Sequence, residues 1–172
     1  MTPQGIARLK LDEAVGGKPP LAAYPDQGGV WTIGWGCTGA GIGPGVVWSL
    51  ARAEAALAER IAEAERGVGA HFTWFEPLRQ GQPVRADVLT NIAFNIGVAG
   101  LSRWPVTLAA IREGDWARAA EDILGNATWR GQVHARCDRC ALAMRTGQWA
   151  EAEDGVSARN AALVGRTGQG AA

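Results

Sequence analysis

The 172-residue sequence lacks a long hydrophobic run, a net charge and an even set of cysteines. No segment reaches the roughly 20 apolar residues that a membrane helix needs, and the opening MTPQGIARLKLDEAVGG contains no signal-peptide core. We therefore expect no membrane insertion and synthesis as a cytoplasmic protein. Seventeen basic residues balance seventeen acidic ones, and this balance disfavours nucleic-acid binding through a broad basic face.

The three cysteines argue against a disulfide framework, because their number is odd and no secretion signal is present. Cys137 and Cys140 have a CxxC spacing, but this pair lies inside a helical pattern and no second pair offers zinc-site spacing. We predict buried or half-buried thiols and no metal site at this pair. A metal or redox role for the CxxC pair is the alternative.

The sequence does contain strong helical patterning, interrupted once by a segment that favours short strands. Helices are expected over about 3–15, 49–66, 83–97, 105–113, 116–124 and 132–146, from apolar residues at helical spacing and from glycine or proline at their ends. Residues 21–35 alternate in polarity and contain turn signals. We expect a single α+β domain that is mostly helical.

The expected domain has a small N-terminal lobe (1–48) that carries an acid-bearing helix and a β-hairpin. A linking helix (49–66) joins it to a larger helical lobe (67–154), and a flexible tail (155–172) rich in glycine and alanine follows.

Gly34, Gly36 and Gly39 form a GxGxxG pattern directly after an apolar run. A dinucleotide fingerprint requires the last glycine to open a helix whose N-terminus meets the pyrophosphate. Here AGIGPGVV follows, a run of helix breakers, and no alternating strand–helix pattern surrounds it. Nucleotide binding is therefore disfavoured.

The same stretch offers a different chemistry. Asp26 and Thr32 are six positions apart in the expected hairpin, an even separation that favours one face, and Glu13 ends the preceding helix. Two carboxylates and a hydroxyl beside a groove suit glycosidic cleavage, in which one acid protonates the leaving oxygen. The alternative is that Asp26 and Thr32 only stabilise the turn.

Ordered blocks over about residues 5–150 resemble the phage-type lysozymes, glycoside hydrolase family 24. LDEAVGGK and AAYPDQGGVWTIGWGCT resemble the family's helix-end Glu followed by a YxDxxGxxTIGxGH hairpin. VLTNIAFNIGVAGL is similar to its central buried helix, IREGDWARAAEDI to its next helix pair, and HARCDRCALAMRTGQW to its closing arginine helix. The resemblance implies a lysozyme-like fold.

The resemblance also implies site residues and a substrate. Glu13 corresponds to the general acid, Asp26 to the carboxylate that positions water or stabilises the oxocarbenium-like transition state, and Thr32 to the residue assisting the water. Arg136 would hold the carboxyl group of Glu13. The implied substrate is the β-1,4 bond between N-acetylmuramic acid and N-acetylglucosamine in bacterial peptidoglycan, cut without metal or cofactor.

The family further implies a monomeric, bacteriolytic phage endolysin. It would accumulate in the host cytoplasm until lysis and reach the periplasm and cell wall through a holin-type pore. Inverting, retaining and transglycosylating outcomes all stay open.

The sequence departs from the family pattern at three places. Asp26 follows Glu13 by thirteen positions, about four more than the family pattern, and GGKPP reads as the insertion. Cys37 stands where the family has His, and Ala14 where a glycine is common. Asp12 is a weaker alternative acid. A second function therefore stays open: a catalytically weakened, peptidoglycan-binding or virion-associated module.

Further side chains allow two interpretations each. Trp31 and Trp35 could stack on sugar rings or pack in the core. Arg139 and Arg145 could meet carboxylates of the wall polymer or pair with acidic residues of the protein.

Overall fold

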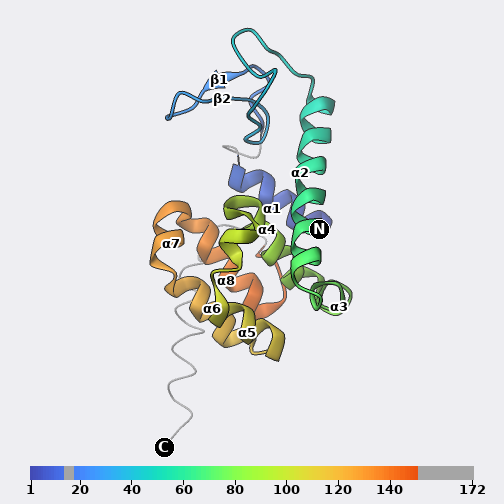
Figure 1. Cartoon of the computed structure of the whole chain (residues 1–172), viewed down its shortest axis with the longest axis vertical. Coiled ribbons are helices and arrows are strands. Elements are labelled where there is room, and N and C mark those ends of the chain that lie inside the picture. Colours follow the sequence, from blue (N-terminus) through green and yellow to red (C-terminus); the bar gives the residue numbers. More distant parts are fainter. Residues whose placement is uncertain (14–17, 151–172) are drawn as a thin grey trace, which may run out of the picture.

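Eight helices and one two-stranded antiparallel sheet make up residues 1–13 and 18–150, the ranges that this computed structural model describes (Figure 1). The helices are α1 (Pro3–Glu13), α2 (Leu50–His71), α3 (Phe75–Gly81), α4 (Pro83–Leu101), α5 (Pro105–Glu113), α6 (Trp116–Gly125), α7 (Ala127–Val133) and α8 (Ala135–Thr146). The strands are β1 (Tyr24–Pro25) and β2 (Trp31–Thr32). The predicted α+β class with a helical majority is confirmed.

The glycine-rich stretch forms a tight turn beyond the hairpin. Ile33 and Cys37 exchange backbone hydrogen bonds of 2.9 Å in both directions. Gly34 and Gly36, inside this turn, have φ of 65° and 73°, a region that glycine enters without steric cost. No helix begins in the described chain between this turn and Leu50, so the segment is a turn and not a phosphate-binding helix start.

Helix α2 runs along one side of the molecule from the hairpin region to the helical bundle (Figure 1). Its first turn is capped by Ser49, whose side chain accepts a hydrogen bond of 3.1 Å from the backbone N–H of Arg52. The helix continues to His71, beyond the predicted end at residue 66, because its buried stripe continues to Val68, which is fully buried.

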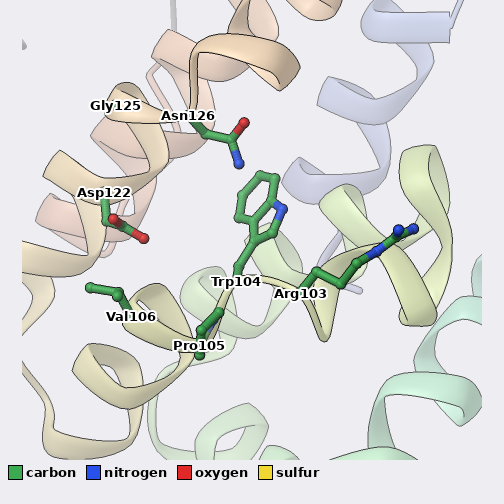
Figure 2. A pocket seen from close by; sticks show the side chains of 7 residues that line it. All are labelled: Arg103, Trp104, Pro105, Val106, Asp122, Gly125 and Asn126. Atoms are coloured by element: carbon green, nitrogen blue, oxygen red, sulfur yellow. The ribbon is translucent and has the colours of Figure 1, made fainter.

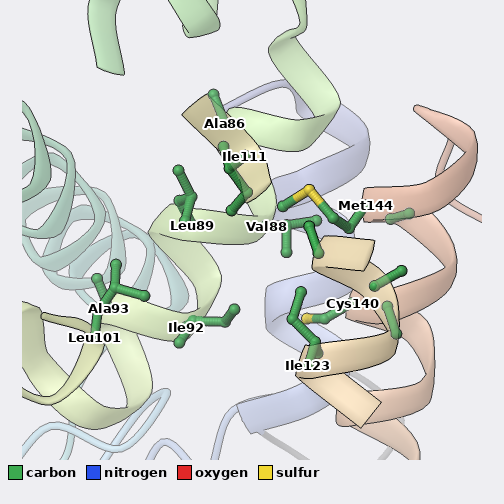
Figure 3. Close-up of a cluster of buried hydrophobic side chains, with 14 of the residues drawn as sticks. Ala86, Val88, Leu89, Ile92, Ala93, Leu101, Ile111, Ile123, Cys140 and Met144 are labelled. Atoms are coloured by element: carbon green, nitrogen blue, oxygen red, sulfur yellow. The ribbon is translucent and has the colours of Figure 1, made fainter. Parts of the chain in front are cut away.

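Helix α4 is the centre of the bundle, as the apolar stripe predicted. Gly97 interrupts its geometry with φ 73° and ψ 161°, at the position where the sequence predicted the helix to close, and helical structure resumes to Leu101. The main core gathers around this helix (Figure 3). Its members include Ala86, Val88, Leu89, Ile92, Ala93, Leu101, Ile111, Ile123, Cys140 and Met144.

Two short helices were missed by the sequence analysis. The interval expected to hold turns contains α3, whose Phe75 is buried against the bundle. The helix predicted over 132–146 is wrong in its start: His134, with φ 42°, separates α7 from α8. Asn126 begins α7 by accepting a hydrogen bond of 3.0 Å from the N–H of Trp129. Both helices are too short for a clear apolar period.

The helix ends around α5 and α6 follow the sequence signals. Gly114 ends α5 in the left-handed conformation with φ 75°, as expected for a helix C-terminal glycine. Asp115 then caps α6 by accepting a hydrogen bond of 3.0 Å from the N–H of Arg118. Both predictions are confirmed.

The predicted end of the first helix at Gly16 and Gly17, and the predicted flexible tail over 155–172, lie outside the described residues. Within the described ranges, no helix combines the length and hydrophobicity required to cross a bilayer.

Asp87 ties α1 to the bundle. It is buried on α4 and accepts hydrogen bonds from the backbone N–H of Thr2 at 2.9 Å and from the indole of Trp149 at 3.3 Å. A Cβ on Gly5 would lie 2.3 Å from the Asp87 carboxylate, so only glycine lets α1 approach this closely. Burial raises the pKa of Asp87, and the hydrogen bonds from Thr2 and Trp149 oppose that rise only in part.

Substituting Asp87→Asn should therefore change how stability depends on pH. Between the ordinary value of 3.8 and the raised folded pKa, the folded state binds more protons than the unfolded state, so this group's contribution falls as pH rises. Urea unfolding from about pH 4 to pH 6 should show the difference in unfolding free energy, wild type minus variant, decreasing with pH.

Glu76→Gln is the surface control: the hydrogen bond from Arg79 lowers the pKa of Glu76 below its ordinary value of 4.5, so above that pH the difference between wild type and this variant should stay small and nearly constant. Its contribution is present above its ordinary pKa and is lost as pH falls. A difference for Asp87→Asn that stays constant over this range contradicts the assignment.

Candidate active site

Glu13 is the last residue of α1, and its carboxylate is held from the far end of the sequence. The Arg136 guanidinium on α8 donates a hydrogen bond of 2.7 Å from Nη1 to Glu13 Oε1. The Arg136 side chain is 6% exposed, whereas that of Glu13 is 16% exposed. A nearly buried cation therefore fixes one oxygen of a carboxylate that stays accessible to solvent.

Asn91 on α4 orients this arginine. Arg136 donates from Nε to Asn91 Oδ1 at 2.8 Å and from Nη2 to the Asn91 carbonyl at 3.1 Å. Asn91 is completely buried, so its amide must find partners inside the protein. The sequence analysis missed Asn91; the available signal was a polar amide between Val88 and Ile92 on a helix that the pattern already described as buried.

Asp12, the alternative acid, belongs to the same network but not to its accessible side. Its side chain is 2% exposed. It accepts hydrogen bonds from Arg139 and, at 3.2 Å, from Asn91 Nδ2, and it lies 3.6 Å from Arg136 Nε. Asp12 is therefore a buried counter-ion for two arginines, whereas Glu13 is the acid at the surface of the network.

Asp26 lies at the start of the hairpin turn and is exposed. Its Oδ1 accepts hydrogen bonds from the backbone N–H groups of Gly28 at 2.9 Å and Val30 at 2.8 Å. These bonds stabilise the turn, as the alternative interpretation expected. The same two bonds fix the orientation of the carboxylate. Among the described residues nothing donates to Oδ2, so this oxygen is open to a water molecule.

Thr32 is nearly buried on β2, and its hydroxyl donates to the Val30 carbonyl at 3.1 Å. The sheet register pairs Thr32 with Tyr24. Asp26 follows Tyr24 by two positions and lies just beyond the end of β1, so continued strand alternation would favour the same face of the hairpin for Thr32 and Asp26.

The turn at residues 33–37 connects the hairpin with the network. A Cβ added to Gly36 would lie 3.4 Å from Glu13 Oε2 and 3.5 Å from Arg60 Nη1. The free oxygen of Glu13 therefore faces this turn, and the end of α1, the turn at residues 33–37, α2 and α8 meet at this point.

The two tryptophans proposed for sugar stacking lie in different environments. Trp31 is half-buried on β2. Trp35 is 1% exposed and packs with Leu9 and Leu57 in a second apolar cluster, with the Lys10 ammonium 4.9 Å from its ring centroid. The structure thus places Trp35 in the core, and stacking on a sugar stays a prediction.

Arg139 and Arg145 each form an ion pair with an acidic residue of the same chain. Arg139 contacts Asp12, and Arg145 Nη2 lies 3.3 Å from Glu121 Oε1. Pairing with acidic residues was the second of the two interpretations that the sequence left open.

The three thiols are buried. Cys137 and Cys140 on α8 have no exposed surface, and burial raises the pKa of Cys137 to about 12 and raises that of Cys140 as well. Cys37 packs with Ile33 and Ala56. Within residues 1–13 and 18–150, no cluster of His, Cys, Asp or Glu could hold a metal ion.

A separate cavity of about 230 Å³ opens in the helical bundle (Figure 2). It is lined by Arg103, Trp104, Pro105, Val106, Asp122, Gly125 and Asn126. Two of its polar groups serve the neighbouring helices: Asn126 caps α7, and Asp122 accepts a hydrogen bond from the Thr107 hydroxyl.

A family model described as phage lysozyme matches residues 19–139. The matched range contains Asp26, Thr32 and Arg136 and begins C-terminal to Glu13. No curated protein gives a significant match. The family match covers most of the chain and agrees with the mostly helical α+β fold. The chain therefore belongs to the phage lysozyme family and is a glycoside hydrolase of the muramidase type that acts on peptidoglycan.

Proposed function

We propose that this muramidase is an endolysin that hydrolyses the β-1,4 bond between N-acetylmuramic acid and N-acetylglucosamine. The observation that carries the proposal is the Glu13 carboxylate, which is fixed by Arg136 through one oxygen and faces the turn at residues 33–37 through the other. An acid held in one orientation, with one oxygen free to approach the substrate, is what protonation of a glycosidic oxygen requires.

In this proposal Glu13 is the general acid and uses Oε2, because Oε1 is occupied by Arg136. Arg136 is a positioning residue and does not touch the substrate. Asn91 acts one step further away by fixing two nitrogens of the Arg136 guanidinium.

Asp26 and Thr32 would act together on the other side of the bond. The two backbone N–H groups that hold Asp26 Oδ1 leave Oδ2 directed at water or at a developing positive charge on the sugar. Thr32, for which strand alternation favours the same face of the hairpin, would help to position that water.

As in the endolysins that the sequence resembles, we propose that the monomer accumulates in the host cytoplasm and reaches the wall through a holin-type pore. Co-expression in bacteria tests this dependence: lysis should require the pore protein. Lysis by this protein alone in cells with an intact inner membrane would contradict it.

Analysis of the reaction products tests the function itself. Purified sacculi digested in water enriched in oxygen-18 should release muropeptides with a reducing muramic acid end that carries the heavy oxygen. Reducing ends on N-acetylglucosamine would contradict the proposed bond. Anhydro-muramic ends without the label would replace hydrolysis by transglycosylation, and sedimentation with sacculi without any release would indicate the weakened binding module.

A further inference from the structure

Arg60 is a second arginine beside Glu13, and it comes from α2. Its Nη1 donates to the Trp35 carbonyl at 2.5 Å, and its guanidinium carbon lies 4.2 Å from the ring centroid of Phe94 on α4. The hydrogen bond fixes the head group against the turn at residues 33–37, and the cation–π contact fixes it against the bundle. The guanidinium is therefore held in place where the two parts of the molecule meet.

Unlike Arg136 and Arg139, Arg60 forms no ion pair with any of residues 1–13 or 18–150. A guanidinium has five N–H donors in a planar fork that matches a carboxylate. The described contacts use one nitrogen, so the positive charge and the other donors remain available to a ligand.

The space next to Arg60 can hold a ligand. A cavity of about 350 Å³ lies between α2 and α4. Arg60, Glu63 and Gly67 line it from α2, and Phe94, Gly97 and Val98 line it from α4. It offers a cation, a carboxylate acceptor and an apolar wall, the combination that suits an acidic sugar with hydroxyl and amide N–H donors.

Arg60, which lines the cavity, also lies near the proposed acid. Glu13 Oε2 and Arg60 Nη1 are both in contact distance of the same point above Gly36, at 3.4 and 3.5 Å. A sugar bound against Arg60 would thus be a neighbour of the bond that Glu13 protonates.

We propose that this cavity binds the N-acetylmuramic acid unit beside the scissile bond, with the Arg60 fork pairing with the carboxyl group of its lactyl substituent. Glu63 accepts a hydrogen bond from a sugar hydroxyl, and Phe94 and Val98 pack against the apolar face of the ring. The inference rests on the proposed function, because it names the substrate group that the same site distinguishes. The lactyl group is the chemical difference between the two sugars of the wall polymer, so Arg60 would be a specificity residue.

Binding of three small probes to the full chain tests the proposal: N-acetylmuramic acid, its methyl ester and N-acetylglucosamine, each titrated while protein NMR shifts are recorded. The acid should perturb the signals of Arg60, Gly67 and Gly97 and bind about tenfold or more tightly than the ester, because charge-assisted hydrogen bonds are the strong ones. N-acetylglucosamine should bind no better than the ester.

The variant Arg60→Met should remove the preference for the acid, and Arg60→Lys should keep part of it. Arg66→Met, an exposed position on the same helix, should leave all three affinities unchanged. Equal binding of the acid and N-acetylglucosamine, no binding of the acid, or an unchanged preference in Arg60→Met would overturn the proposal. Release of labelled muropeptides from sacculi by the wild type is measured separately, so the failure of this inference and the failure of the muramidase function are distinguishable.

Discussion

Replacing Glu13 with glutamine should reduce wall lysis by about 10²- to 10⁴-fold, the range that a general acid supplies. Glutamine keeps an oxygen that accepts the Arg136 hydrogen bond, so the fold should survive the change while the transferable proton is lost. The measurement is the clearing rate of outer-membrane-permeabilised Gram-negative cells, with thermal unfolding recorded for each variant.

Glu59→Gln is the matched control, because Glu59 is an acid on α2 whose side chain is 71% exposed. It should clear cells at the wild-type rate. Equal clearing by wild type and Glu13→Gln would remove Glu13 from the mechanism. The same assay on Asp12→Asn separates the two adjacent acids, since Asp12 is a buried counter-ion and its loss should appear mainly as lower stability.

Replacing Arg136 with methionine should lower the free energy of unfolding by about 3–5 kcal/mol, the usual effect of removing one partner from a buried ion pair. The substitution leaves the Asp12 carboxylate with one cation fewer and leaves the Asn91 oxygens without their main donor. Glu13 also loses its positioning contact, so the activity of the folded fraction should fall as well. Urea unfolding and clearing rates measure the two effects.

Arg79→Met is the comparison, since the Arg79–Glu76 pair lies on the surface with both side chains about half exposed. Such a pair contributes little, so stability should be nearly unchanged. Arg136→Lys should recover part of the stability but little of the activity, because an ammonium cannot reproduce the planar contacts to Glu13 and Asn91 together. A loss for Arg136→Met no larger than that for Arg79→Met would contradict the role of the network.

The ends of the helices were predictable where local chemistry decides them. Gly114 and Asp115 act through their own backbone and the next turn, so their roles can be seen in a short stretch of sequence. Helices α3 and α7 could not be found in this way, because each has seven residues and is stabilised by packing against the bundle.

In the candidate site too, the residues could be proposed from the sequence but their long-range contacts could not. Glu13, Asp26 and Thr32 were proposed from spacing and from the family resemblance, and Arg136 from the resemblance alone. The structure brings Arg136 into contact with Glu13 across 123 positions of sequence. The catalytic roles themselves stay predictions. Spacing alone contains no information about a contact of that separation.

The contacts made by Asn91, Asp12 and Arg60 could not be predicted from the sequence, and the reason is physical. Asn91 meets Arg136 and Asp12 at separations of 45 and 79 positions, and the buried amide is satisfied only after three helices have packed. Trp35 shows the converse: a residue type suited to sugar stacking is used for the core because its neighbours Leu9 and Leu57 enclose it.

Cys140 gives this network a built-in reporter. Its sulfur lies 3.6 Å from Asn91 Oδ1, the oxygen that also accepts from Arg136, and the residue has no exposed surface. An alkylating reagent can reach this sulfur only when the packing of α8 against the neighbouring helices opens. The rate of labelling at Cys140 therefore measures how often the support beneath the acid opens in the native protein, and it can be followed without introducing any probe.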